Sequence, residues 1–138
     1  MKRTFIKSKI HRAKVTGADL NYVGSISICP KLMEAADMLE YEFVHVNNLS
    51  NGDHWETYVI PGGPGEITLN GPPARHFEKD DLVVIMTIAE MEAGQTETHR
   101  TVLVDSDNNY TDTITGKFGF KDTREKINVW TNEQKAQG

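Results

Sequence analysis

The sequence contains a single cysteine, Cys29, among 138 residues. A disulfide within the chain is therefore impossible, and we expect a protein of a reducing compartment, the cytoplasm. The sequence also has no apolar run of membrane-spanning length, and its first nine residues, M-K-R-T-F-I-K-S-K, lack the apolar core of a signal peptide. We therefore expect neither a membrane span nor a secretory signal.

An excess of positive charge is also missing. The chain has 15 lysines and arginines against 20 aspartates and glutamates, which gives a formal net charge of -5. Nucleic-acid binders usually carry a basic stripe, so we predict no nucleic-acid partner. The glycine-rich run at 61–65 lacks the lysine of a phosphate loop, and the acidic run at 105–112 has Tyr110 where a calcium loop needs glycine. We assign no metal site.

The length suits one domain. Gly17–Leu20 reads as a turn, Asn51-Gly52 as a hairpin turn, and Pro30 as the start of a helix. We expect that helix to have an apolar face made of Leu32, Met33, Ala36, Met38 and Leu39. Alternation of polar and apolar residues predicts strands. They fall at 4–9 and 10–16 (or one long bent strand), at 25–29 as a half-buried strand, and at 42–48, 54–60, 66–69, 81–88 and 101–104.

Many short strands with one or two short helices favour a compact β-barrel. We place this barrel domain at residues 1–104. Residues 105–138 are rich in aspartate, asparagine, threonine and lysine, and we expect a loosely held polar extension there.

The dipeptide Gly24-Ser25 could be a peptide bond that breaks itself. Glycine can adopt strained dihedrals, and the Ser25 hydroxyl is close enough to attack the Gly24 carbonyl through a five-membered ring. Loss of the peptide nitrogen gives an ester, elimination gives dehydroalanine, and water converts that group to a pyruvoyl group. Gly-Ser pairs are common in turns, so the dipeptide alone predicts no chemistry.

Three motifs give the dipeptide its context. K-x-H-R-x-K-V-T-x-A-D-L-x-Y-x-G-S covers residues 9–25, N-G-x-x-x-x-T-Y covers 51–58, and N-G-P-P-A covers 70–74. In this order and at nearly these spacings they resemble the aspartate 1-decarboxylase family, pyruvoyl-dependent enzymes that make β-alanine for pantothenate synthesis. The resemblance covers roughly residues 1–88. It implies a six-stranded double-psi β-barrel, assembled as a homotetramer with active sites between subunits.

The same resemblance implies the chemistry. The chain would cleave itself between Gly24 and Ser25, spontaneously or with a maturation partner, and Ser25 would become the covalent pyruvoyl cofactor. This group forms a Schiff base with the amine of an amino-acid substrate and accepts the electrons released as CO2 leaves. No external cofactor is then required.

The resemblance also implies the roles of single residues. Tyr58 is the expected proton donor, and Thr57 supports the Gly24 carbonyl during self-cleavage. Adjacent residues of a regular strand face opposite sides, so we expect a bulge or twist that lets both reach one site. The other positions that match the substrate site are Lys9, His11, Tyr22, His54, Asn70, Gly71 and Pro72.

Two positions depart from the family pattern. His54 stands where the family normally has an arginine that grips a substrate carboxylate, and Asn47 stands where it often has an aromatic residue. Arginine is always charged and offers a planar fork, whereas histidine loses its charge near neutral pH. Three hypotheses follow: decarboxylation of aspartate, the same chemistry on another amino acid, or an uncleaved barrel that acts as a binding module.

Overall fold

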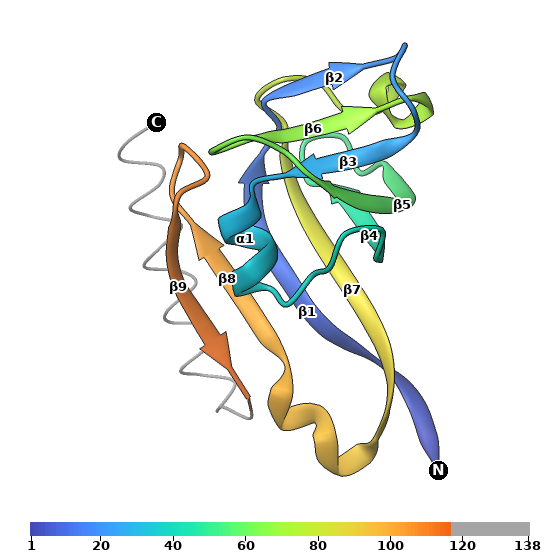
Figure 1. The fold of residues 1–138 in the computed structure, drawn as a ribbon, viewed down its shortest axis with the longest axis vertical. Helices are drawn as coiled ribbons and strands as arrows, with labels where there is room; N and C mark the ends of the chain where they lie inside the picture. The colour runs from blue at the N-terminus through green and yellow to red at the C-terminus, as the bar shows by residue number, and fades with distance from the viewer. Residues whose placement is uncertain (117–138) are drawn as a thin grey trace.

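The computed structural model of the protein describes residues 1–116. This part of the chain is mainly β, as the sequence predicts. Its strands form one mixed sheet in the order β2-β6-β3-β5-β4-β7-β1-β8-β9 (Figure 1). The strands are β1 (Lys2–Lys14), β2 (Gly17–Asp19), β3 (Ser25–Ile28), β4 (Phe43–Asn48), β5 (His54–Pro61), β6 (Ile67–Asn70), β7 (Leu82–Glu92), β8 (Arg100–Val104) and β9 (Tyr110–Thr115). The helices are α1 (Pro30–Ala35), η1 (Pro72–Arg75) and η2 (Ala93–Thr98).

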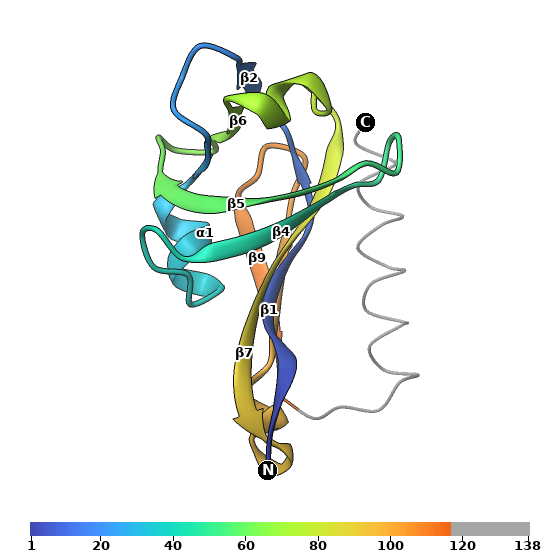
Figure 2. The same cartoon turned by 90° about the vertical axis from the view of Figure 1, so that its right-hand side faces the viewer.

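The two longest strands, β1 and β7, pair in antiparallel fashion and run along the long axis of the molecule (Figures 1 and 2). Residues 4–14 therefore belong to one strand rather than two, and residues 15 and 16 lie beyond its end. Its register shifts between Ile10 and Ala13, where Arg12 has a φ of 60°. Positive φ is unusual for a residue with a side chain, and here it marks a bulge that bends β1.

The predicted hairpin is confirmed. β4 and β5 pair in antiparallel fashion and lie side by side in Figure 2, and the turn between them contains Gly52 with a φ of 81°. Only glycine adopts such a dihedral at low cost, which explains the Asn-Gly pair. β6, β7 and β8 also fall where the alternation places them.

Two local predictions on the N-terminal side are wrong. Gly17–Asp19 is a short strand that pairs in parallel with β6, because Thr16 hydrogen-bonds to Ile67 and aligns the two segments. β3 is buried at all four positions instead of half-buried. It lies between β5 and β6, so both of its edges are paired, and the residues on both of its faces are buried, including the small Ser25 and Ser27.

Helix α1 begins at Pro30 as predicted, since proline lacks only an N–H that the first turn leaves unpaired. It ends at Ala35, earlier than the apolar pattern suggested. Leu32 and Met33 pack into the core, whereas Leu39 lies beyond the helix and is 71% exposed. The prediction that Leu39 belongs to the apolar face is therefore wrong.

Strand β9 was not predicted. It pairs with β8 at the edge of the sheet, and the loop before it is held by buried Asn108. The Asn108 amide donates to the carbonyls of Lys14 at 2.7 Å and Gly65 at 3.0 Å. Residues 105–115 are thus tied to the sheet, while 117–138 of the expected extension lie outside the described residues. Among residues 1–116, no helix has the length and apolarity needed to cross a membrane.

Candidate active site

The Ser25 side chain is buried at the start of β3, with an exposed fraction of 1%. Ser25 pairs with Asn70 across the antiparallel β3–β6 ladder, so the two side chains lie on the same side. The Asn70 amide donates to the Ser25 hydroxyl at 3.0 Å and to the Ser27 hydroxyl at 3.1 Å. The Ser25 hydroxyl donates to the Val23 carbonyl at 3.1 Å. Asn70 therefore fixes the position of the Ser25 hydroxyl oxygen, the atom that would attack the Gly24 carbonyl.

Gly24 lies against the turn that follows β6. A Cβ atom on Gly71 would lie 2.8 Å from the Gly24 Cα and 3.0 Å from its nitrogen. Gly71 also has a φ of 77°, and its N–H donates to the Asp19 carbonyl at 2.7 Å. Gly24 itself is not among the glycines with positive φ, and a Cβ there would meet Pro72 at an ordinary 3.8 Å. The close approach at the Gly24–Ser25 bond therefore depends on Gly71.

Replacing Gly71 with alanine should slow cleavage of the Gly24–Ser25 bond at least about tenfold. The new Cβ must displace Gly24, and the backbone of Gly71, with φ 77° and ψ -145°, lies in a region that costs a residue with a side chain about 1–3 kcal/mol. Cleavage is measured as the fraction of cut chain after refolding. Gly52→Ala is the matched control, because Gly52 has a φ of 81° but a Cβ there meets nothing within 4 Å. Equal cleavage rates in the two variants would exclude a role for the close approach.

Thr57 and Tyr58 lie on the strand next to Gly24 and Ser25. β3 and β5 pair in parallel with Ile26 opposite Val59, so the preceding residues, Ser25 and Tyr58, meet at the same level of the sheet. The β4–β5 register runs without a shift, so the expected bulge is absent and the two side chains point to opposite faces. Both nevertheless line one open hollow of about 470 Å³ beside the middle of β5, together with Tyr41 and Phe43.

One face of the sheet gathers several of the predicted substrate residues. Residues paired directly across strands point to the same side. The registers of β1, β7, β4 and β5 place four such residues in one row: Lys9, Met86, His45 and Glu56. Two residues further along β5, Tyr58 lies on this same face. The predicted cation Lys9 and the predicted proton donor Tyr58 therefore share a face, although three strand spacings separate β1 from β5.

The two departures from the family pattern are partners in the next row of this face. Asn47 is paired with His54 across the hairpin, and their side chains are hydrogen-bonded, His54 Nδ1 to Asn47 Oδ1, at 2.6 Å. His54 also approaches His45 and Glu56. Sequence reasoning did not identify His45 and Glu56. The signal that could have found them is the alternation His45-Asn47 and His54-Glu56 on either side of the Asn-Gly turn.

His11 belongs to the same strand as Lys9 but is uncharged at neutral pH. Burial, followed by the nearby charges of Lys9 and Arg12, lowers the pKa of His11 to about 4. Of the two cations predicted on this strand, only Lys9 can then offer a positive charge to a substrate carboxylate, because His11 can act only as a neutral hydrogen-bonding group.

The pKa of His11 predicts that acid destabilises the fold. The unfolded chain takes up this proton near pH ~6.5, whereas the folded chain takes it up only at about 4. The free energy of unfolding should therefore fall as the pH is lowered through this window. Urea titrations at several pH values should show a smaller fall in His11→Gln than in the parent protein. The same pH dependence in both proteins would contradict the lowered pKa.

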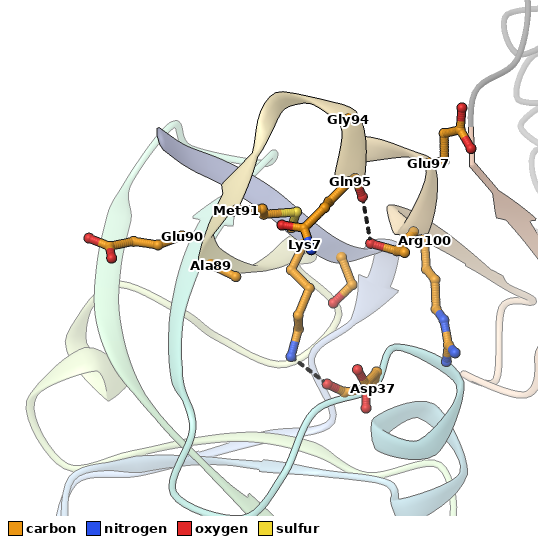
Figure 3. A pocket seen from close by; sticks show the side chains of 11 residues that line it. Lys7, Asp37, Ala89, Glu90, Met91, Gly94, Gln95, Glu97 and Arg100 are labelled. Atoms are coloured by element: carbon orange, nitrogen blue, oxygen red, sulfur yellow. Dashed lines mark hydrogen bonds between the residues drawn. The ribbon is translucent and has the colours of Figure 1, made fainter. Parts of the chain in front are cut away.

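Tyr22 lies in the exposed segment that leads to Gly24, with 53% of its surface accessible. A second hollow, of about 580 Å³, lies elsewhere, between β1, β7 and η2 (Figure 3). The two cationic side chains that line this hollow already have partners. Lys7 donates to the Asp37 carbonyl and to Glu42, and Arg100 donates to the Ala35 carbonyl. None of the predicted site residues lines this hollow.

Comparison with known proteins agrees with this geometry. The sequence matches the aspartate decarboxylase family model over residues 1–111. The aspartate 1-decarboxylase of Flavobacterium psychrophilum is 50% identical over 101 residues, which cover 72% of this chain and 87% of the relative. That of Pelotomaculum thermopropionicum is 53% identical over 103 residues, covering 73% and 78%. That of Listeria monocytogenes is 49% identical over 106 residues, covering 75% and 84%. The chain belongs to the aspartate decarboxylase family, which confirms the resemblance in its motifs.

Proposed function

We propose that this protein is an aspartate 1-decarboxylase, a carboxy-lyase that converts L-aspartate to β-alanine and CO2 with a pyruvoyl group made from its own Ser25. The observation that carries the proposal is the arrangement around the scissile bond. The buried hydroxyl of Ser25 is held by Asn70, and Gly24 lies against Gly71, in a chain of this family.

Self-processing begins when the Ser25 oxygen bonds to the Gly24 carbonyl carbon and the carbon–nitrogen bond breaks, with the hydroxyl proton passing to the nitrogen. Elimination of the ester releases Gly24 as a carboxylate and leaves dehydroalanine, which water converts to the pyruvoyl group and ammonia. The role proposed for Thr57 is to donate to the carbonyl oxygen as it gains charge. The hydrogen bonds found for the Ser25 side chain among the described residues go to neutral groups, Val23 and Asn70. Water or a maturation partner would then assist the first proton transfer.

The surroundings of Ser25 fit the cofactor that it would become. The Asn70 amide can donate to a carbonyl oxygen as it now donates to the hydroxyl. When formed, the pyruvoyl group supplies the electron-accepting carbonyls for decarboxylation. Tyr58 holds a proton at its phenol oxygen for the carbon that loses CO2, and Tyr41 and Phe43 border the same hollow.

The finer architecture belongs to the same proposal: a six-stranded double-psi barrel, assembled as a homotetramer with active sites between subunits. Leu20, Tyr22 and Val23 directly precede the scissile bond and are 51%, 53% and 70% exposed, which suits an interface that covers them. Lys9 lies three strand spacings, about 14 Å, from Glu56 along their common row, so a second copy could supply a nearer cation. The single cysteine, Cys29, fits the proposed cytoplasmic location.

The experiment is a panel assay of the purified protein with several L-amino acids, in which released CO2 and the product amine are measured. L-Aspartate should give the highest kcat/KM and β-alanine as the product. The His54–Asn47 pair favours one alternative, the same reaction on a different amino acid. A higher kcat/KM for another amino acid would establish that alternative, and the absence of CO2 from every amino acid would contradict decarboxylation.

A further inference from the structure

Three side chains on the β4–β5 hairpin converge on one point. His45 is paired directly with Glu56, and His54 lies two residues before Glu56 on the same face of β5. His45 Nδ1 lies 3.5 Å from His54 Nε2 and 3.4 Å from a Glu56 oxygen, and His54 Nε2 lies 3.6 Å from that same oxygen. Within residues 1–116, no other three histidine, cysteine or acidic side chains come together in this way.

These separations match the first coordination shell of a metal ion. The three atoms form an almost equilateral triangle, and a point equally distant from its corners lies about 2.0 Å from each, close to the distance at which Zn²⁺ binds imidazole nitrogen and carboxylate oxygen. Two histidines and one carboxylate are also a common ligand set of zinc sites that keep a fourth position open.

The Asn47 side chain orients one of the ligands. The 2.6 Å contact between His54 Nδ1 and Asn47 Oδ1 requires the proton to lie on Nδ1, since an amide oxygen can only accept. His54 Nε2 then presents its lone pair to the point between the three side chains. Hydrogen bonds of this kind to the far nitrogen of a histidine ligand are typical of metal centres. We propose that His45, His54 and Glu56 bind a divalent transition-metal ion of the zinc class, with one coordination position open.

The test is a metal titration of tag-free protein that has been treated with a chelator and desalted. Calorimetry with Zn²⁺ should show one ion per chain with a dissociation constant of about 10 µM or lower. Co²⁺ should give the visible absorption bands of four-coordinate cobalt. His54→Ala and Glu56→Gln should each weaken binding roughly 100-fold, and Asn47→Ala roughly tenfold.

His76→Ala is the matched control. His76 also pairs with a carboxylate on the surface, with its Nδ1 at 3.1 Å from Asp53, but it lacks a third ligand. Its loss should leave zinc affinity unchanged. Circular dichroism checks that each variant is folded, and His45→Gln repeats the test if His54→Ala is not. The absence of saturable binding to the parent protein, or equal loss of affinity in His76→Ala and His54→Ala, would overturn the proposal.

The open coordination position would bind a carboxylate of the substrate, an inference that rests on the proposed function. With neutral imidazoles, Glu56 gives the cluster one negative charge, which repels a dicarboxylate, whereas a divalent ion gives it one positive charge. Tyr58 lies on the same face only two residues, about 7 Å, along β5 from Glu56. A substrate carboxylate would therefore occupy the open position while its other end reaches Tyr58.

If the metal binds the substrate carboxylate, removing the metal should change KM more than kcat. Chelation should raise the KM for L-aspartate at least about tenfold with a smaller change in kcat, added Zn²⁺ should restore it, and His54→Ala should not respond to metal. An unchanged KM in protein that binds zinc would overturn the substrate role alone. If no β-alanine forms under any condition, the proposed function fails, while the metal titration still decides the metal site.

Discussion

Replacing Ser25 with alanine should leave one uncut chain with no decarboxylase activity. The variant lacks the oxygen that attacks the Gly24 carbonyl, so neither the ester nor the pyruvoyl group can form. The fold should persist, because within residues 1–116 the hydroxyl makes two hydrogen bonds, with Val23 and Asn70. Gel electrophoresis under denaturing conditions and an assay of CO2 release measure the two effects, and we expect activity to fall to the level of the buffer.

Ser27→Ala is the control for this variant. Ser27 also accepts a hydrogen bond from the Asn70 amide, at 3.1 Å, and is likewise buried in β3. Its loss should therefore disturb the packing of Asn70 to a similar extent without removing the nucleophile. A cut, active Ser27→Ala beside an uncut, inactive Ser25→Ala is the expected result. Cleavage of the Ser25→Ala chain between residues 24 and 25 would show that the hydroxyl is not the nucleophile.

Replacing Tyr58 with phenylalanine should separate catalysis from self-processing. The ring stays in the hollow but the phenol proton is lost, and removal of a general acid lowers rates by about 10²–10⁴-fold. The chain should still be cut after Gly24, because the proposal gives Tyr58 no part in that step. Single-turnover and steady-state rates with L-aspartate, measured on fully cut protein, give the size of the loss in kcat.

Tyr41→Phe is the matched control for the phenol. The Tyr41 ring centre lies 6.1 Å from that of Tyr58, and both rings line the same hollow. Removing the Tyr41 hydroxyl should leave kcat within about twofold of the parent value, because the proposal gives this hydroxyl no proton to transfer. A similar kcat in both variants would remove Tyr58 from the role of proton donor.

The hydrophobic pattern predicted most of the sheet but not its edges. β7, with buried residues at every second position of its first half, and the hairpin around Asn51-Gly52 follow directly from alternation and turn chemistry. β2 and β9 carry little apolar signal, since Ile114 is the only buried residue in either strand. Their strand form comes from pairing with β6 and β8, which a local pattern cannot reveal.

The candidate site was predictable where its residues are close in sequence and not where it depends on register. Gly24-Ser25 and Asn70-Gly71 could be recognised as motifs, although the contact between the two glycines needs the β3–β6 pairing. His45 and Glu56 were missed because they lie eleven residues apart in the sequence. Only the register of the β4–β5 hairpin places them opposite each other. The low pKa of His11 likewise comes from burial, which the alternation of β1 alone does not determine.

The most direct measurement is the mass of the purified, folded protein under denaturing conditions. Self-processing predicts two polypeptides, residues 1–24 and 25–138, and the longer one should begin with a ketone that reacts with hydrazine reagents. A single polypeptide of full length, with an ordinary serine at position 25 and the capacity to form β-alanine, would contradict the account.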